Sequence, residues 1–260
     1  MCTFRRDSGQ KGRFHDGKCT YVNGGADVTV AAVIFAWGGT LSEFVNAELV
    51  DAWRLAARHL DPDHEDEIAA QLVRVEAEFW ATTSSHQRSA TLADLLAIAA
   101  LELRLDVAEA LLEEAALHHL DAWTPHIRHD PDAVGALTDL RADGLRIGML
   151  SNTHWPRAFH ERFLERDGLV DLIDARLYTS EMPFQKPHPS AFLAAAEALG
   201  VDPEQAVFVG DRPWDDISGA RSTGMRTVLR PNPVAPDIDD IEPDARITQL
   251  RQLRDLVRNW

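Results

Sequence analysis

The 260-residue sequence predicts an α/β fold, a doubly wound parallel sheet with an inserted all-helical segment. Two observations predict it. Short β-branched runs alternate with helical stretches from residue 28 to the C-terminus, which is typical of parallel strands joined by crossover helices. The alternation is interrupted once, over residues 42–127, where the periodicity is helical throughout and no strand is evident.

The first predicted strand covers residues 28–35 (VTVAAVIF) and leads into a glycine-rich turn. Its unbroken apolar run is typical of a strand that is covered on both faces. The turn AWGGT follows directly, so Ala36 and Gly38 are expected at the carboxyl end of this strand.

Helices with apolar residues at three- and four-residue spacing are expected in the insertion. They cover residues 46–60, 66–80, 91–103 and 106–123, with breaks at 61–63 (DPD) and 82–89 (TTSSHQRS). Thr91 and Asp106 are the predicted N-caps of the last two helices, because short polar side chains there accept hydrogen bonds from free backbone N–H groups.

After the insertion, helices and strands alternate to the end of the chain. Helices are expected at residues 132–144, 156–168, 190–200, 215–224 and 249–260. Strands are expected at residues 145–150, 174–179, 206–210 and 225–230 and near Ile247. Gly144 closes the first of these helices, since glycine is favoured where a helix ends in a left-handed conformation.

The chain therefore divides into three regions. Residues 1–27 are polar and lack apolar periodicity, so we expect a disordered tail or an artefact of start-site assignment. Residues 28–41 and 128–260 form the predicted α/β core, and residues 42–127 form a helical cap. Ligands of such sheets bind at the carboxyl ends of the strands, and an insertion after the first strand could cover that end.

The composition excludes several classes of function. A formal net charge of −16 opposes binding to nucleic acid or to anionic membranes, which requires clustered Lys and Arg. The sequence has no apolar run of about 18 residues and no apolar signal core, so we expect a cytoplasmic protein. Its two cysteines are too few for a disulfide framework or a structural zinc site. A small-molecule partner is expected, and no pattern indicates an oligomeric state.

Lysine is unusually rare in this chain. Only three of the 26 Lys and Arg residues are lysines, and beyond residue 18 the only one is Lys186. A sequence that otherwise uses Arg is expected to keep a lysine where a compact ammonium group is needed in place of a planar guanidinium group.

Four short signals share one location, because each follows a predicted strand at its carboxyl end. They are FAWGGTL, LSNT with Ser151 and Asn152, QKPHP with Lys186, and VGDRPWDDISGA with Asp211, Asp215 and Asp216. In this order and spacing they resemble the haloacid dehalogenase (HAD) superfamily of phosphohydrolases, from residue 28 to the C-terminus. The resemblance implies a flavodoxin-like core, a helical cap, Mg²⁺ and a small phosphorylated metabolite as substrate.

The resemblance also implies a role for each motif residue. Ser151 or Asn152 would hydrogen-bond the phosphoryl oxygens, and Lys186 would neutralise the nucleophile and the phosphate. Asp211 would hold the metal together with Asp216, which directly precedes the Ile-x-Gly-Ala of the motif, or with Asp215 as the alternative. Such groups act together, because a carboxylate that attacks a phosphoester needs a metal ion, an ammonium group and hydrogen-bond donors to stabilise the transferring oxygens.

The first motif departs from the family pattern Asp-x-Asp-Gly-Thr. Ala36 occupies the nucleophile position and Gly38 the acid–base position. Ala36 is either an introduced Asp-to-Ala change or the native residue of a pseudoenzyme. Because the other motif residues remain, the sequence favours a phosphatase-like enzyme that is impaired at Ala36. The alternative is a noncatalytic protein that binds phosphorylated metabolites.

Two related chemistries are disfavoured. Phosphonate cleavage requires a cap lysine, and residues 42–127 contain none. A haloacid dehalogenase lacks the acidic pair of the fourth motif, which this chain has.

The remaining aromatic residues and histidines are expected to be mainly structural. Trp37, Trp155 and Trp214 lie beside motifs and could form an aromatic mouth, with core packing expected for at least two of them. Four histidines between residues 118 and 129 lack metal-ligand spacing and are expected on a solvated face or at a hinge.

Overall fold

The computed structural model describes residues 13–15, 18–20, 29–43, 49–81, 85–232 and 240–260. Its main sheet has six parallel strands in the order β5-β4-β3-β6-β7-β8. They are β3 (Ala32–Phe35), β4 (Arg146–Ser151), β5 (Ala175–Tyr178), β6 (Ala206–Gly210), β7 (Arg226–Leu229) and β8 (Ala245–Arg246). β3, the first of these strands along the chain, lies inside the sheet, with β4 and β6 on either side. The predicted doubly wound parallel sheet is therefore confirmed.

Helices cover both faces of this sheet. On one face, Ile34 and Phe208 share a core with α7 (Pro189–Leu199) and α8 (Gly219–Ser222). On the other face, Val33 and Phe35 share a core with α5 (Ala133–Ala142), α6 (Arg157–Arg166) and α9 (Leu253–Arg258). The two-sided burial explains why the sequence of β3 is apolar without alternation.

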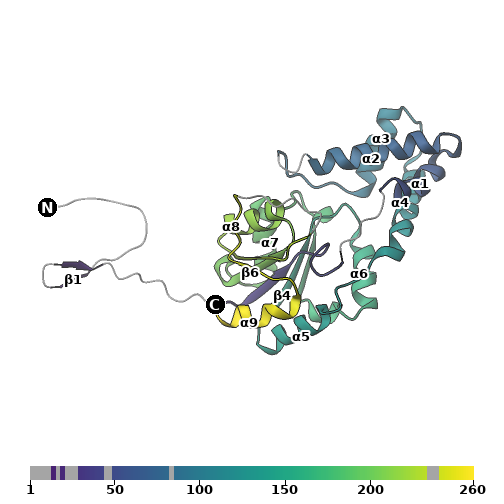
Figure 1. Cartoon of the computed structure of the whole chain (residues 1–260). Coiled ribbons are helices and arrows are strands. Elements are labelled where there is room, and N and C mark those ends of the chain that lie inside the picture. Colours follow the sequence, from purple (N-terminus) through teal and green to yellow (C-terminus); the bar gives the residue numbers. More distant parts are fainter. Residues whose placement is uncertain (1–12, 16–17, 21–28, 44–48, 82–84, 233–239) are drawn as a thin grey trace, which may run out of the picture.

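The first four α-helices after β3 form a unit that stands beside the sheet (Figure 1). They are α1 (Leu49–Leu60), α2 (Glu65–Ala81), α3 (Leu92–Leu103) and α4 (Glu109–Trp123). α1 packs against both α2 and α4, and its Trp53 is completely buried. Two connecting segments that run side by side join this unit to the sheet, with hydrogen bonds from Glu43 N to Arg128 O (2.9 Å) and from Asp130 N to Leu41 O (2.9 Å).

The two predicted caps in this unit have different outcomes. Thr91 caps α3, and its hydroxyl accepts a hydrogen bond from Asp94 N at 3.2 Å while the Asp94 carboxylate accepts one from Thr91 N at 2.8 Å. Asp106 does not cap α4, which begins after Ala108 without a side-chain cap. The prediction for Asp106 was wrong because α3 ends at the left-handed Arg104 and α4 begins only after Ala108, so Asp106 lies in the link between the two helices.

Residues 1–27 lie mostly outside the described residues, but they contain a short antiparallel hairpin of β1 (Arg13–His15) and β2 (Lys18–Thr20).

Within the described ranges, no helix has the length and apolar character that crossing a membrane would require.

Several histidines are buried in the protein interior. His119 is completely buried and stacks on Trp53, with ring centroids 3.8 Å apart. The side chain of His129 is also buried, between Trp37 Nε1 (3.0 Å) and Asp167 Oδ2 (2.7 Å). The expectation of a solvated position was wrong for both, because each ring is enclosed by partners from distant parts of the chain.

Burial lowers the pKa of three histidines in the protein interior, His119, His154 and His160, to about 3. All three are therefore neutral in the folded protein at pH 7, whereas each would bind a proton near pH 6.5 in the unfolded chain.

We expect the protein to lose stability as the pH falls below about 6.5. The unfolded chain then binds protons that the folded chain excludes, so the stabilising contribution of each neutral histidine is present above pH 6.5 and declines as the pH falls. Between pH 7 and pH 5 the free energy of unfolding should fall by about 2 kcal/mol per histidine. Urea unfolding at the two pH values measures the loss.

His119→Phe provides the matched control, because it keeps the ring against Trp53 and removes the titrating group. Its free energy of unfolding should fall by about 2 kcal/mol less than that of the parent protein between pH 7 and pH 5. Equal losses in parent and variant would contradict the assignment of His119 as a buried neutral group.

Candidate active site

A cavity of about 140 Å³ lies at the carboxyl ends of the central strands. Its wall contains every site residue predicted from the sequence. These are Ala36, Gly38, Ser151, Asn152, Lys186, Asp211, Asp215 and Asp216. Trp37, Trp80 and Arg212 complete the lining.

Strand register explains why residues so distant in sequence meet here. Phe35 of β3 pairs with Met149 of β4 and with Val209 of β6, so the three strands end at the same edge of the sheet. Ala36 follows β3, Ser151 ends β4, and the last motif follows β6.

The centre of the site is a buried ion pair. Lys186 Nζ lies 2.7 Å from Asp216 Oδ1, and the two side chains are only 4% and 1% exposed. The other oxygen, Asp216 Oδ2, accepts hydrogen bonds from the backbone N–H groups of Asp211 and Arg212, both at 3.0 Å. Both oxygens of Asp216 are therefore engaged within the protein.

A local departure from α-helical geometry permits this arrangement. The helix expected at residues 215–224 begins as a π-helix over Pro213–Ser218, and α8 follows it. The wider turn places the Asp216 carboxylate beside the backbone N–H groups of Asp211 and Arg212, just before the π-helix begins. Gly210 leaves the necessary space, because a Cβ atom at that position would lie 2.4 Å from the Asp216 carboxyl group.

Asp211 is held by the turn that follows β3 and by Asn232. Its carboxylate accepts hydrogen bonds from Asn232 Nδ2 (2.8 Å) and from Thr40 Oγ1 (3.3 Å). Gly39 adopts a φ of +74°, and a Cβ atom there would lie 2.3 Å from Asp211 Oδ2. Burial and the nearby charge of Asp216 raise the pKa of Asp211 to about 6.

Asp215 is the least satisfied of the three carboxylates. Its Oδ1 is buried and has no hydrogen-bond partner among the described residues, while Oδ2 lies 3.5 Å from Arg212 Nη1. Burial, followed by the charge of Asp216, raises the pKa of Asp215. The causes of both raised pKa values, burial and the charge of Asp216, are ones that an added cation at this end of the cavity would offset.

The carboxylates fit Mg²⁺ only as a partial ligand set. No three His, Cys, Asp or Glu side chains in the described ranges gather as a metal site, and Ala36 contributes a methyl group where the family pattern has a carboxylate. Mg²⁺ commonly binds through one or two carboxylates together with water and phosphate oxygens. The orphaned oxygen of Asp215 and the raised pKa of Asp211 are compatible with that mode.

Asn152 fixes the segment that carries Lys186. Its Nδ2 donates to Lys186 O at 2.9 Å, and its Oδ1 accepts from Lys186 N at 2.8 Å. Both polar atoms of this amide are thus engaged with the protein backbone, and Asn152 lines the cavity together with Ser151, which ends β4.

The helical insertion also contacts the Lys186 segment. Gln185 N donates to Gln87 O at 2.9 Å, Gln185 Nε2 donates to Arg88 O at 3.1 Å, and Ser89 N donates to Pro183 O at 3.2 Å. Of the described residues of the insertion, only Trp80 lines the cavity.

Sequence reasoning missed several contributors. Trp80, Asn232 and Arg212 were not identified, and Thr40 was noted only as part of a turn. For Arg212 the signal was its place inside the fourth motif. Trp80 and Asn232 carry no local signal, because their roles depend on contacts with distant segments.

The three tryptophans beside the motifs do not form one aromatic mouth. Trp37 lines the cavity and is buried, and Trp155 packs partly buried against the same core with its ring centroid 6.4 Å from that of Trp37. Trp214 is 41% exposed and lies outside the cavity wall. Core packing for two of the three was correctly expected.

A sequence model described as haloacid dehalogenase-like hydrolase matches residues 30–224. The chain is 33% identical over 152 residues to a glyceraldehyde 3-phosphate phosphatase from Methanopyrus kandleri, covering 57% of this chain and 64% of that protein. It is 34% identical over 123 residues to a phosphoserine phosphatase from Thermus thermophilus, covering 47% and 49%. The matches thus span less than two thirds of these relatives.

The fold is similar to solved structures. A 2-haloacid dehalogenase from Pseudomonas syringae superposes with a TM-score of 0.68 and 26% identity, covering 89% of this chain and 100% of that chain. A HAD phosphatase from Thermococcus onnurineus superposes with a TM-score of 0.61 and 24% identity, covering 88% and 98%.

The buried ion pair leads to a stability prediction. Lys186→Met should lower the free energy of unfolding by about 3 to 5 kcal/mol, because it leaves Asp216 buried without its cation. Arg212→Met is the matched control, since Arg212 is 52% exposed and its contact with Asp215 should contribute less than about 1 kcal/mol. Urea unfolding of both variants tests the difference, and equal losses would contradict it.

Proposed function

The chain belongs to the haloacid dehalogenase-like hydrolases, and on this basis we propose that its cavity binds small phosphomonoesters for hydrolysis, with the chemistry impaired at Ala36. One observation carries the proposal. A single cavity is lined by Ser151, the buried Lys186 and three aspartates, and Ala36, at the nucleophile position of the family pattern, lines the same cavity. The phosphatase relatives support the same class of reaction.

Each phosphate-binding residue has a distinct role in this proposal. Ser151 donates a hydrogen bond to a phosphoryl oxygen, and Lys186 attracts the phosphate as a compact charge. Asn152 is a positioning residue, because its side chain holds both backbone polar groups of Lys186.

For the metal, we assign Asp211 and Asp215 as the carboxylate ligands. The geometry supports Asp215 over Asp216, because both oxygens of Asp216 already bind protein groups while Asp215 Oδ1 lacks a partner in the described structure. When bound, Mg²⁺ would neutralise charge on the phosphate. Asp216 would continue to hold Lys186 in place.

The helical insertion serves as a cap in this proposal. Trp80 reaches the cavity from α2, and the backbone bonds from residues 87–89 hold the insertion against the Lys186 segment. Such a cap excludes water from the bound phosphate.

A noncatalytic phosphometabolite-binding protein is the second candidate. The observation that favours it is the loss of both carboxylates of the first motif, at Ala36 and Gly38. Dehalogenation of a haloacid is less well supported, because the curated relatives named above are phosphatases and the cavity wall holds the acidic residues of the fourth motif.

We expect Ala36→Asp to create phosphatase activity on small phosphomonoesters. The new carboxylate supplies both the nucleophile and a further metal ligand, so turnover should rise on the order of 10³-fold. Phosphate release from a panel of phosphomonoesters with Mg²⁺ measures the gain. Ala36→Asn is the matched control, since it keeps the size of the side chain without the charge, and it should remain inactive.

The result distinguishes the two candidates. If Ala36→Asp folds and binds Mg²⁺ but hydrolyses none of the panel, and Ala36→Asp/Gly38→Asp does no better, the hydrolase proposal fails. The noncatalytic binding protein would then take its place.

Metal binding can be tested on the parent chain. With only two carboxylate ligands, Mg²⁺ should bind more tightly when inorganic phosphate is also present, because phosphate completes the ligand set. Calorimetric titration with Mg²⁺, with and without phosphate, measures the difference. Asp211→Asn should reduce the heat in both titrations, and identical heats for parent and variant would remove the metal assignment.

A further inference from the structure

His129 connects the wall of the active-site cavity to the end of α6. It lies on one of the two segments that join the helical insertion to the sheet. Its Nε2 lies 3.0 Å from Trp37 Nε1, and its Nδ1 lies 2.7 Å from Asp167 Oδ2. Trp37 directly follows Ala36 and lines the cavity, whereas His129 and Asp167 are not part of the cavity wall. A chain of hydrogen bonds therefore runs from outside the cavity to the turn that carries position 36.

The chemistry of the two partners decides which ring nitrogen of His129 carries the proton. The ionised carboxylate of Asp167 can only accept hydrogen bonds, so Nδ1 of His129 must donate. The indole N–H of Trp37 can only donate, so Nε2 of His129 must accept. Both conditions hold only for the neutral imidazole with its proton on Nδ1, because a protonated ring would turn a second N–H group toward the indole N–H.

The charges around the ring are compatible with this state. Arg166 binds both oxygens of Asp167, through Nε to Oδ1 (2.7 Å) and through Nη2 to Oδ2 (2.6 Å), and this pairing lowers the pKa of Asp167 to about 2. Burial lowers the pKa of His129, although Asp167 opposes the shift. His160 also acts on the ring through its charge, but burial keeps it neutral. At pH 7 Asp167 is therefore ionised and His129 is neutral.

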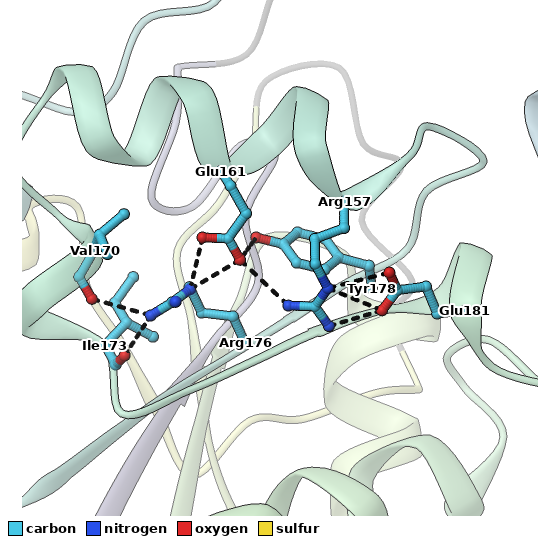
Figure 2. A network of polar contacts seen from close by, with 7 residues as sticks. All are labelled: Arg157, Glu161, Val170, Ile173, Arg176, Tyr178 and Glu181. Carbon is cyan, nitrogen blue, oxygen red and sulfur yellow. Dashed lines mark hydrogen bonds and ion pairs between the residues drawn. The ribbon is translucent and has the colours of Figure 1, made fainter.

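Asp167 is a firm partner because the helix that it follows is anchored to the sheet. Glu161 of α6 accepts hydrogen bonds from Arg176 Nε (3.0 Å to each oxygen) and from Tyr178 Oη (3.1 Å), and both partners belong to β5. Figure 2 shows this network, in which Arg176 also donates to two backbone carbonyl groups after the end of α6. The contact between Asp167 and His129 thus starts from a fixed element.

At the other end of the chain, Trp37 belongs to the turn that follows β3. Its carbonyl oxygen accepts hydrogen bonds from three N–H groups of this turn, the first of which is Thr40 N at 3.2 Å. Thr40 Oγ1 in turn donates to Asp211, one of the two proposed metal ligands, at 3.3 Å. The backbone of the turn is held by these bonds, and the side chain of Trp37 is held by His129.

We propose that His129 is a positioning residue of the active-site cavity, which as the Nδ1–H tautomer holds the Trp37 indole and with it the turn that carries position 36. The effect on ligand binding rests on the proposed function, whereas the chain of hydrogen bonds does not. If the indole is released, phosphate binding must first order the Trp37 side chain again. This cost corresponds to an affinity about fivefold lower.

NMR of the ¹⁵N-labelled full chain at pH 7 tests the tautomer. The ring correlations of His129, identified by their loss in His129→Gln, should show a proton on Nδ1 and none on Nε2. The chain has seven tryptophans, and the indole N–H signal of Trp37 is the one that Trp37→Phe removes. This signal should lie at the downfield position of a hydrogen-bonded group.

Three variants test the positioning role, with Mg²⁺ and inorganic phosphate as the ligands in calorimetric titration. His129→Phe keeps a ring but cannot accept the indole proton, so the Trp37 signal should move upfield and the phosphate affinity should fall about fivefold. His129→Gln should keep both near the parent values, because its amide offers one acceptor and one donor. His118→Phe is the matched control at an exposed position and should behave as the parent.

The proposal is overturned if His129 of the parent carries its proton on Nε2, if His129→Phe leaves the Trp37 signal unchanged, or if His129→Phe and His129→Gln bind phosphate equally well. An absence of phosphate binding by the parent would remove the proposed function and the affinity effect together. The NMR signals would still decide whether the chain of hydrogen bonds exists.

Discussion

Two buried aspartates, the partly buried Asp215 and one buried lysine lie together at the carboxyl ends of β3, β4 and β6, and the surrounding structure is arranged around their charge. Asp216 takes the ammonium group of Lys186 and two backbone N–H groups, which requires the π-helical turn and the absence of a side chain at Gly210. Asp211 requires the close approach of Gly39. A buried charge is tolerated only when its partners are held in place. The fixed conformation of these loops therefore follows from electrostatics.

Ala36 changes the charge balance of this site as well as its chemistry. A carboxylate at position 36 would add negative charge beside Asp211 and Asp215, whose pKa values are already raised. The methyl group at this position reduces the electrostatic repulsion among the carboxylates of the pocket when no cation is bound. An alanine in place of the carboxylate of the family pattern therefore makes the cation-free pocket easier to bury.

The interface between the insertion and the core builds two cavities with different character. One is polar and small, and Trp80 is its contribution from the insertion. The other is apolar and is formed largely by α3 and α4. Residues 151–157 contribute to both, and Leu92 N of α3 donates a hydrogen bond to His154 O at 2.7 Å. A displacement of the insertion would therefore alter both cavities together.

The sequence by itself determined the alternation of strands and helices, the helical stretch that follows the first strand, the Thr91 cap and the predicted site residues that line the first cavity, but not Trp80. These features depend on local periodicity, on short-range hydrogen bonds and on the rule that parallel strands end at one edge of a sheet. Tertiary structure alone decided the burial of His119 and His154, the contacts of Asn152 with Lys186, and the second cavity. Each of these depends on which distant segments pack together, and that long-range packing leaves no periodic mark on any one segment.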